Sequence, residues 1–159
     1  MKPHCAYCAI LSAGLICGVL DGLSAIALSG YFGTKPTRVF QGIASGLLGK
    51  SAFQGGAASA LLGLALHFLI ALGAATVYYF ASRSLPVLID RALVCGIAFG
   101  VAVHLFMTFV VIPLSAIGNR PFVLRTFVNL LIISMVVVGP SISLTVRHFA
   151  VTRSPYRSQ

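Results

Sequence analysis

Four long runs of apolar residues constrain the fold of this chain more than any other feature. They cover about residues 8–32, 59–80, 92–112 and 123–146, and each is close to the roughly 20 residues that cross a bilayer as an α-helix. Only 8% of the residues are charged, whereas a soluble domain carries about a quarter. The sequence therefore predicts an all-α integral membrane four-helix bundle, a single transmembrane domain over residues 1–159 in contact with the lipid bilayer.

The segment between the first two spans is too polar to cross the membrane, because Lys35, Arg38 and Lys50 interrupt it. From about residue 38 to 50, apolar and polar side chains separate at helical spacing. The apolar side contains Val39, Phe40, Ile43 and Leu47, and the other side contains Arg38, Gln41, Ser45 and Gly49. This pattern predicts a short amphipathic helix in the membrane interface. The glycines also allow a re-entrant turn, which is tolerated only where protein buries it.

The later spans carry their own boundary signals. The third is expected to stop at Pro113, and Gly139 with Pro140 should kink the fourth. The tail, residues 147–159, is basic and polar and is predicted to be loose. Tyr78 and Tyr79, near the end of the second span, are predicted to belong to an interfacial aromatic belt.

The net charge of +9 does not indicate nucleic-acid binding. Lys and Arg stand singly at the ends of apolar runs, where they favour anionic headgroups. Four spans place both termini on one side, with six basic residues there against five on the other. This slight excess favours cytoplasmic termini. A signal peptide cleaved near Ala27 is the alternative for the first run, but the run continues past that residue, which favours an uncleaved span.

Four cysteines are present, and two of them, Cys17 and Cys95, lie in apolar runs as packing residues. Cys5 and Cys8 form a C-x-x-C pair near the N-terminus. His4 precedes this pair, whereas haem attachment needs a histidine after it, and this end supplies too few ligands for structural zinc. Two interpretations stay open: a redox-active, metal-binding or lipidated thiol pair, or an N-terminus in which the two cysteines have no specific role. No cofactor is predicted.

Asp21 is one of only two acidic residues, and it lies near the middle of the first span. An ionisable side chain at that depth costs several kcal/mol and usually faces the bundle interior with a partner. The other spans offer His67, His104 and Asn129 as candidates.

The depths and faces of these residues agree. His67 precedes the centre of the second span, and His104 follows the centre of the antiparallel third span, so both lie toward the side opposite the termini. Each also falls on a stripe of small residues, which lets membrane helices approach closely. The three stripes are Gly14, Gly18, Asp21 and Ala25; Ala60, Gly63, His67, Ala71 and Ala74; and Gly96, Gly100, His104 and Thr108.

Two functional hypotheses follow from this polar layer. In the first, Asp21, His67 and His104, with Asn129 and Thr108, bind a small polar species or conduct a proton. In the second, the layer only fixes helix packing in a structural or assembly protein. Lys50 and Gln54 are either a gate over the layer or a solvated face.

Other activities have less support in the sequence. Two imidazoles and a carboxylate can bind zinc, but ligands on three helices have no diagnostic spacing, so no metal site is predicted. No arrangement of nucleophile and base stands out, which argues against an enzyme.

Several strings carry a resemblance: "RVFQGIASGLLGKSAFQGG", "LGLALHFLIA", "VYYFASR" and "FVVIPLSA". With them the chain resembles a group of small bacterial inner-membrane proteins that have four predicted spans and no established activity. The resemblance extends from the first span to the loop after Pro113. It implies a multi-pass protein of the bacterial inner membrane and assigns no site residues. Self-association or a membrane protein partner stays open.

Overall fold

The computed structural model describes residues 3–118 and 123–151, and the regular structure within these ranges is helical. The α-helices are α1 (Pro3–Tyr31), α2 (Pro36–Leu48), α3 (Gly56–Ser84), α4 (Val87–Asp90), α5 (Ala92–Phe106), α6 (Ile112–Leu114), α7 (Leu124–Ile133) and α8 (Gly139–Val151). A 3₁₀ turn, η1 (Gly49–Phe53), follows α2. Two π-helical turns, η2 (Met107–Val111) and η3 (Ser134–Val138), interrupt the later helices. The predicted all-α class is confirmed.

Four helices are long and apolar enough to cross a membrane: Ala6–Tyr31, Gly56–Ser84, Ala92–Leu114 and Leu124–Val151. The third combines α5, η2 and α6, and the fourth combines α7, η3 and α8. The irregularity expected at Gly139 and Pro140 is the π turn directly before them, since proline has no N–H to donate.

The fourth helix continues beyond its predicted end. It runs to Val151, so the prediction of a loose tail from residue 147 is wrong over the first five tail residues. The cause is packing, because Val146 is buried and Phe149 lies against the core. The rest of the predicted tail, residues 152–159, lies outside the described residues.

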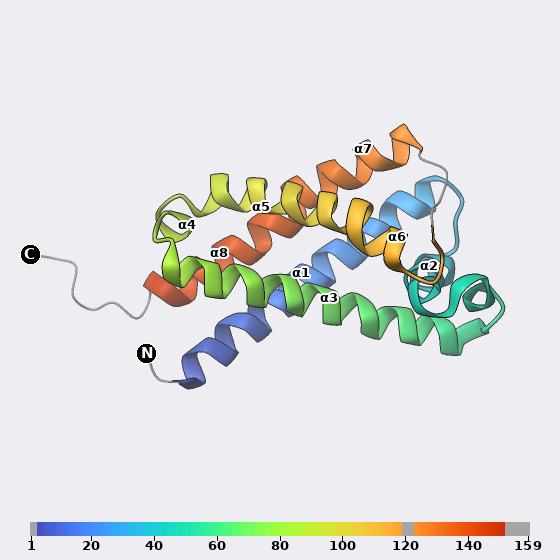
Figure 1. Ribbon diagram of the computed structural model, residues 1–159, viewed down its shortest axis with the longest axis horizontal. Coiled ribbons are helices and arrows are strands. Elements are labelled where there is room, and N and C mark those ends of the chain that lie inside the picture. The colour runs from blue at the N-terminus through green and yellow to red at the C-terminus, as the bar shows by residue number, and fades with distance from the viewer. Residues whose placement is uncertain (1–2, 119–122, 152–159) are drawn as a thin grey trace, which may run out of the picture.

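The long helices form an incompletely closed bundle, with the two termini at one end and α2 at the other (Figure 1). Helix α3 packs on α1, α1 packs on α8, and α8 with η3 packs on α5. Helices α3 and α5 make little direct contact with each other. The bundle therefore has a seam between α3 and α5.

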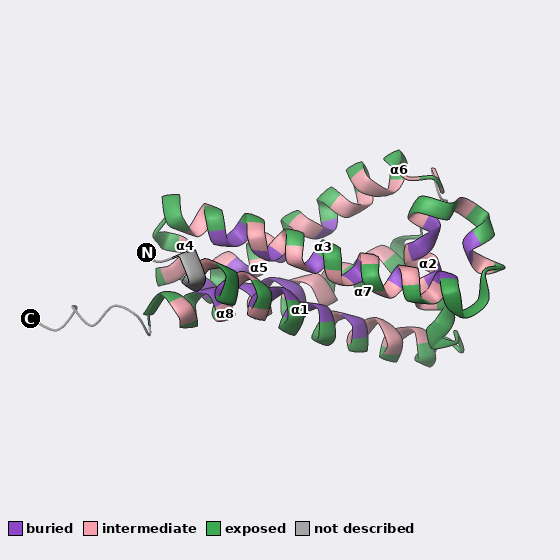
Figure 2. Ribbon diagram, turned by 90° about the horizontal axis from the view of Figure 1, so that it is seen from below, coloured by how far each residue is buried: buried purple, intermediate pink, exposed green. Residues whose placement is uncertain are grey.

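Small residues bring the helices together as the stripes predicted. Buried positions on α3 include Gly63, His67 and Ala71. Those on α5 include Gly96, Gly100 and His104. A Cβ at Gly100 would collide with the carbonyl oxygen of Ser134, so only glycine allows this approach. Figure 2 shows buried residues along the inner faces of the helices and exposed residues along the outer faces.

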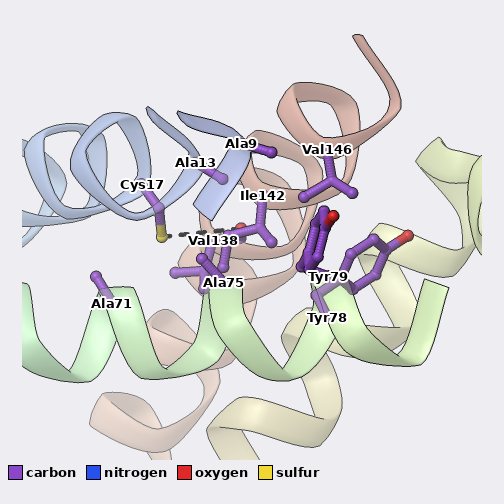
Figure 3. Close-up of a cluster of buried hydrophobic side chains, with 10 residues drawn as sticks. All are labelled: Ala9, Ala13, Cys17, Ala71, Ala75, Tyr78, Tyr79, Val138, Ile142 and Val146. Atoms are coloured by element: carbon purple, nitrogen blue, oxygen red, sulfur yellow. Dashed lines mark hydrogen bonds between the residues drawn. The ribbon is translucent and has the colours of Figure 1, made fainter. Parts of the chain in front are cut away.

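The largest apolar core lies in the half of the bundle near the termini (Figure 3). Small side chains of α1, such as Ala9 and Ala13, leave room there for Tyr78 and Tyr79 of α3. The hydroxyl of Tyr78 donates a hydrogen bond to the carbonyl oxygen of Leu88, 2.8 Å away. Both tyrosines are buried, so the expectation of an exposed aromatic belt was wrong for these two residues.

Helix α2 is the short helix predicted between spans one and two, but it faces the protein differently than expected. In Figure 1 it is seen nearly end-on, so it runs across the long helices. Its buried residues are Gln41, Ala44 and Ser45, which belong to the more polar side, whereas Leu47 is exposed. Small side chains explain this choice, because the backbone at Phe40 lies directly against Gly63 of α3.

Candidate functional site

A cavity of about 440 Å³ occupies the space between α3 and α5. Asp21 of α1, His67 of α3 and His104 of α5 all line it, together with Thr108 of η2. The structure therefore places the three ionisable residues of the predicted layer, and one of its two polar companions, around a single space. The ends of α2 and α6 approach the same cavity through Leu47 and Ile112.

His67 is buried and joined to α1 by a hydrogen bond. Its Nε2 lies 2.8 Å from the backbone carbonyl oxygen of Gly18. A carbonyl oxygen only accepts, so Nε2 carries the hydrogen in this bond. Asp21 lies three residues further along α1, on the same side of the helix, and it lines the same cavity as His67. The hydrogen bond thus joins α1 to α3 close to Asp21.

His104 differs from His67 because its Nε2 is buried without a hydrogen-bond partner in the described part of the chain. The side chain is only 7% exposed. Its ring lies against Phe127 of α7, with 4.8 Å between the ring centroids. Leaving a buried polar atom unpaired costs about 1–3 kcal/mol. Such an atom on the wall of a cavity indicates a missing partner, either water or a ligand.

Both π turns contribute to the cavity wall. Met107, Thr108 and Val111 belong to η2, and Ser134 and Val138 belong to η3. A π turn is a costly interruption of a helix and occurs frequently at functional sites. Here two of them, on two different spans, border the same space.

The remaining wall is mostly apolar, with Ile43, Leu66, Ile70 and Val103 among its residues. Among the described residues, those lining the cavity include no lysine or arginine, and Asp21 supplies the only carboxyl group. Charge therefore favours a proton, a cation or a neutral polar molecule over an anion. No group of three His, Cys, Asp or Glu side chains within the described ranges is placed to hold a metal ion.

Three predicted site residues lie away from the cavity wall. Asn129 lies on α7, one position before Leu130, which does line the cavity. Lys50 and Gln54 lie exposed on η1 and at its C-terminal end. Their role as a gate stays a prediction.

Sequence reasoning missed two polar residues of the wall, Ser115 and Ser134. Ser134 shares a four-residue spacing with Leu130 and Val138, and this spacing was a usable signal. Ser115 follows α6 in a turn, where no periodicity marks it. For the N-terminal thiol pair, Cys8 is exposed, and the side chain of Cys5 lies outside the described residues.

Comparison of the chain with protein-family models, with curated proteins and with solved structures finds no match. The resemblance to small bacterial inner-membrane proteins is thus supported only as far as its architecture, a small membrane protein with four spans. The functional argument rests on the cavity.

Proposed function

We propose that this four-span membrane protein binds a small polar species, or passes a proton, in the cavity lined by Asp21, His67 and His104. The observation that carries the proposal is the buried Nε2 of His104, which borders the cavity and has no hydrogen-bond partner among the residues that the structure describes. A residue selected only for packing would be expected to have its polar atoms paired.

The chemistry of the wall fits proton or cation handling. Carboxyl and imidazole groups both exchange protons, and chains of Asp and His inside membranes commonly serve as relays. The titratable groups that line the cavity are Cys17, Asp21, His67 and His104. The hydroxyl of Thr108 adds a group that both donates and accepts hydrogen bonds.

One observation favours the alternative, a purely structural role. The hydrogen bond from His67 to Gly18 joins two helices and satisfies His67 without any ligand. His67 would then fix the packing of α1 on α3. The two hypotheses differ at His104, whose Nε2 has no such bond within the described ranges.

Water access to His104 separates the two hypotheses. Solid-state NMR of histidine-labelled protein in bilayers measures polarisation transfer from water to the imidazole nitrogens. We expect transfer to His104, assigned by its loss in His104→Leu, with His148 on the exposed surface as a positive control. Transfer to His148 without transfer to His104 would show a dry cavity and favour the structural role.

The membrane of residence and the orientation are part of the proposal. The resemblance supports a bacterial inner membrane, and the small excess of Lys and Arg at the terminal end supports cytoplasmic termini. Protease access to a C-terminal tag in inverted and right-side-out vesicles tests the orientation. Cleavage in inverted vesicles alone is the expected result.

A further inference from the structure

A second cavity, of about 240 Å³, lies at the end of the bundle near the termini, away from the polar layer. The last turns of α3 and α8 form most of its wall. The lining residues are Ala9, Tyr79, Ser82, Arg83, Ile89, Val146, Phe149 and Ala150.

Tyr79 brings an unpaired polar atom to this cavity. The side chain is 4% exposed, and its hydroxyl oxygen is buried with no hydrogen-bond partner among the described residues. The hydroxyl of the neighbouring Tyr78, by contrast, donates a hydrogen bond to the carbonyl oxygen of Leu88. Figure 3 shows Tyr79 within the core, near Val146 of α8. The unpaired hydroxyl therefore marks a place for a ligand acceptor.

The polar side chains near Tyr79 indicate the charge of the ligand that this cavity would bind. Ser82 and Arg83 follow Tyr79 by three and four residues, so both lie on the same side of α3 as Tyr79. The Arg83 guanidinium has five N–H donors, which allows it to hold an anion in addition to other partners. No carboxyl group is among the described residues that line this cavity. The donors of Tyr79 and Arg83 thus favour an oxyanion.

The apolar residues that line the cavity indicate what is attached to the anionic group of the ligand. Ala9, Ile89, Val146 and Phe149 are apolar and continue the cavity from Arg83 toward the core. Arg83 itself is exposed in the last turn of a membrane span, at the depth where lipid headgroups lie. The cavity is too small for a whole phospholipid, but it suits a phosphate with the first part of an attached chain. A free phosphate would leave the apolar walls uncovered.

We infer that this second cavity is a binding site for the headgroup of an anionic phospholipid. The phosphate accepts hydrogen bonds from Tyr79 and Arg83, and the adjoining apolar chain covers Val146 and Phe149. This site is independent of the cavity around Asp21 and His104.

Native mass spectrometry of the detergent-solubilised protein tests the inference, with phosphatidylglycerol, phosphatidylcholine or inorganic phosphate added separately. The informative variants are Tyr79→Phe and Arg83→Gln. Arg91→Gln is the matched control, because Arg91 is exposed at the same end but does not line the cavity. Tyr79→Phe removes a hydroxyl that makes no hydrogen bond within the described part of the chain, so the lipid-free variant should fold and melt like the native protein.

We expect phosphatidylglycerol to bind the native protein and Arg91→Gln more tightly than phosphatidylcholine does. Its affinity should fall about tenfold in Tyr79→Phe, as for one lost charge-assisted hydrogen bond, and also in Arg83→Gln. Equal binding of phosphatidylglycerol to all four proteins would overturn the site. Binding of inorganic phosphate that needs Tyr79 and Arg83, without a preference for the lipid, would overturn the assignment to a lipid headgroup.

Discussion

The Nε2 of His67 lies 2.8 Å from the backbone carbonyl oxygen of Gly18, and this bond joins the second span to the first at the level of Asp21. Glycines make the approach possible. A Cβ at Gly18 would lie 2.6 Å from the ring of Phe68, and a Cβ at Gly22 would lie 3.3 Å from His67 Nε2. The contact therefore needs glycine on α1 and histidine on α3. Nε2 of His67 has a hydrogen-bond partner in this contact, whereas Nε2 of His104 has none among the described residues.

His67→Leu should lower the stability of the folded protein, because it removes a bond between helices. Such bonds contribute about 0.6 kcal/mol on average and up to about 1.7 kcal/mol. Reversible unfolding in SDS and detergent mixtures measures this difference. The exposed His148→Gln serves as the control. A His67→Leu protein as stable as the native one would show that the bond does not hold α3 on α1.

His104→Leu should have the opposite effect on stability. Its Nε2 is buried and has no hydrogen-bond partner among the described residues, so an apolar side chain of similar volume removes an unsatisfied group that costs about 1–3 kcal/mol. We expect stability equal to or above that of the native protein in the same unfolding assay, together with loss of binding or flux. A strongly destabilised variant would mean that His104 has a structural partner.

Gly100→Ala should destabilise the contact between α5 and η3. The added Cβ would meet the carbonyl oxygen of Ser134, which is backbone and cannot move aside cheaply. Overpacking of this kind costs about 1–3 kcal/mol. Gly73→Ala on α3 is the matched control, because a Cβ there meets nothing within 4 Å. It should be neutral or slightly stabilising in the unfolding assay, since alanine favours helix. Similar losses in both variants would contradict the close packing described at Gly100.

Gln41→Ala should loosen α2. The Nε2 of Gln41 donates to the carbonyl oxygen of Gly56, 3.0 Å away, at the start of α3. Limited proteolysis of the segment between α1 and α3 should become faster in the variant, while Gln54→Ala, which changes an exposed residue, should not alter it. Unchanged cleavage in Gln41→Ala would indicate that apolar contacts alone hold α2.

The sequence was sufficient to predict the four spans and to group Asp21, His67 and His104, because both predictions follow from hydropathy and helical periodicity. Hydropathy and length defined four helices. Counting residues from the centre of each antiparallel span placed Asp21, His67 and His104 at a similar depth in the membrane. The stripe of Gly96, Gly100 and His104 also placed Thr108 correctly on the cavity wall.

The position of Asn129, the two π turns and the buried face of α2 could not be predicted from the sequence. They depend on the exact rotation of the helices and on irregular backbone. Asn129 adjoins Leu130 but points about 100° away from it on an α-helix, so a small error in rotation removes it from the cavity. The π turns at Met107–Val111 and Ser134–Val138 have no sequence pattern of their own. Helix α2 turned its small polar face inward because close backbone contact at Gly63 outweighed the apolar pattern.

Proton flux into proteoliposomes under an imposed pH gradient tests the central claim most directly. The comparison is between native protein, Asp21→Asn and the control Asp90→Asn, which removes the other carboxyl group, exposed on α4. We predict flux in the native protein and in Asp90→Asn, and a loss of at least about tenfold in Asp21→Asn, because general acid–base transfer depends on the carboxyl group. Absence of flux in all three folded proteins would contradict proton passage. Equal flux in Asp21→Asn and the native protein would show that the Asp21 cavity is not the path.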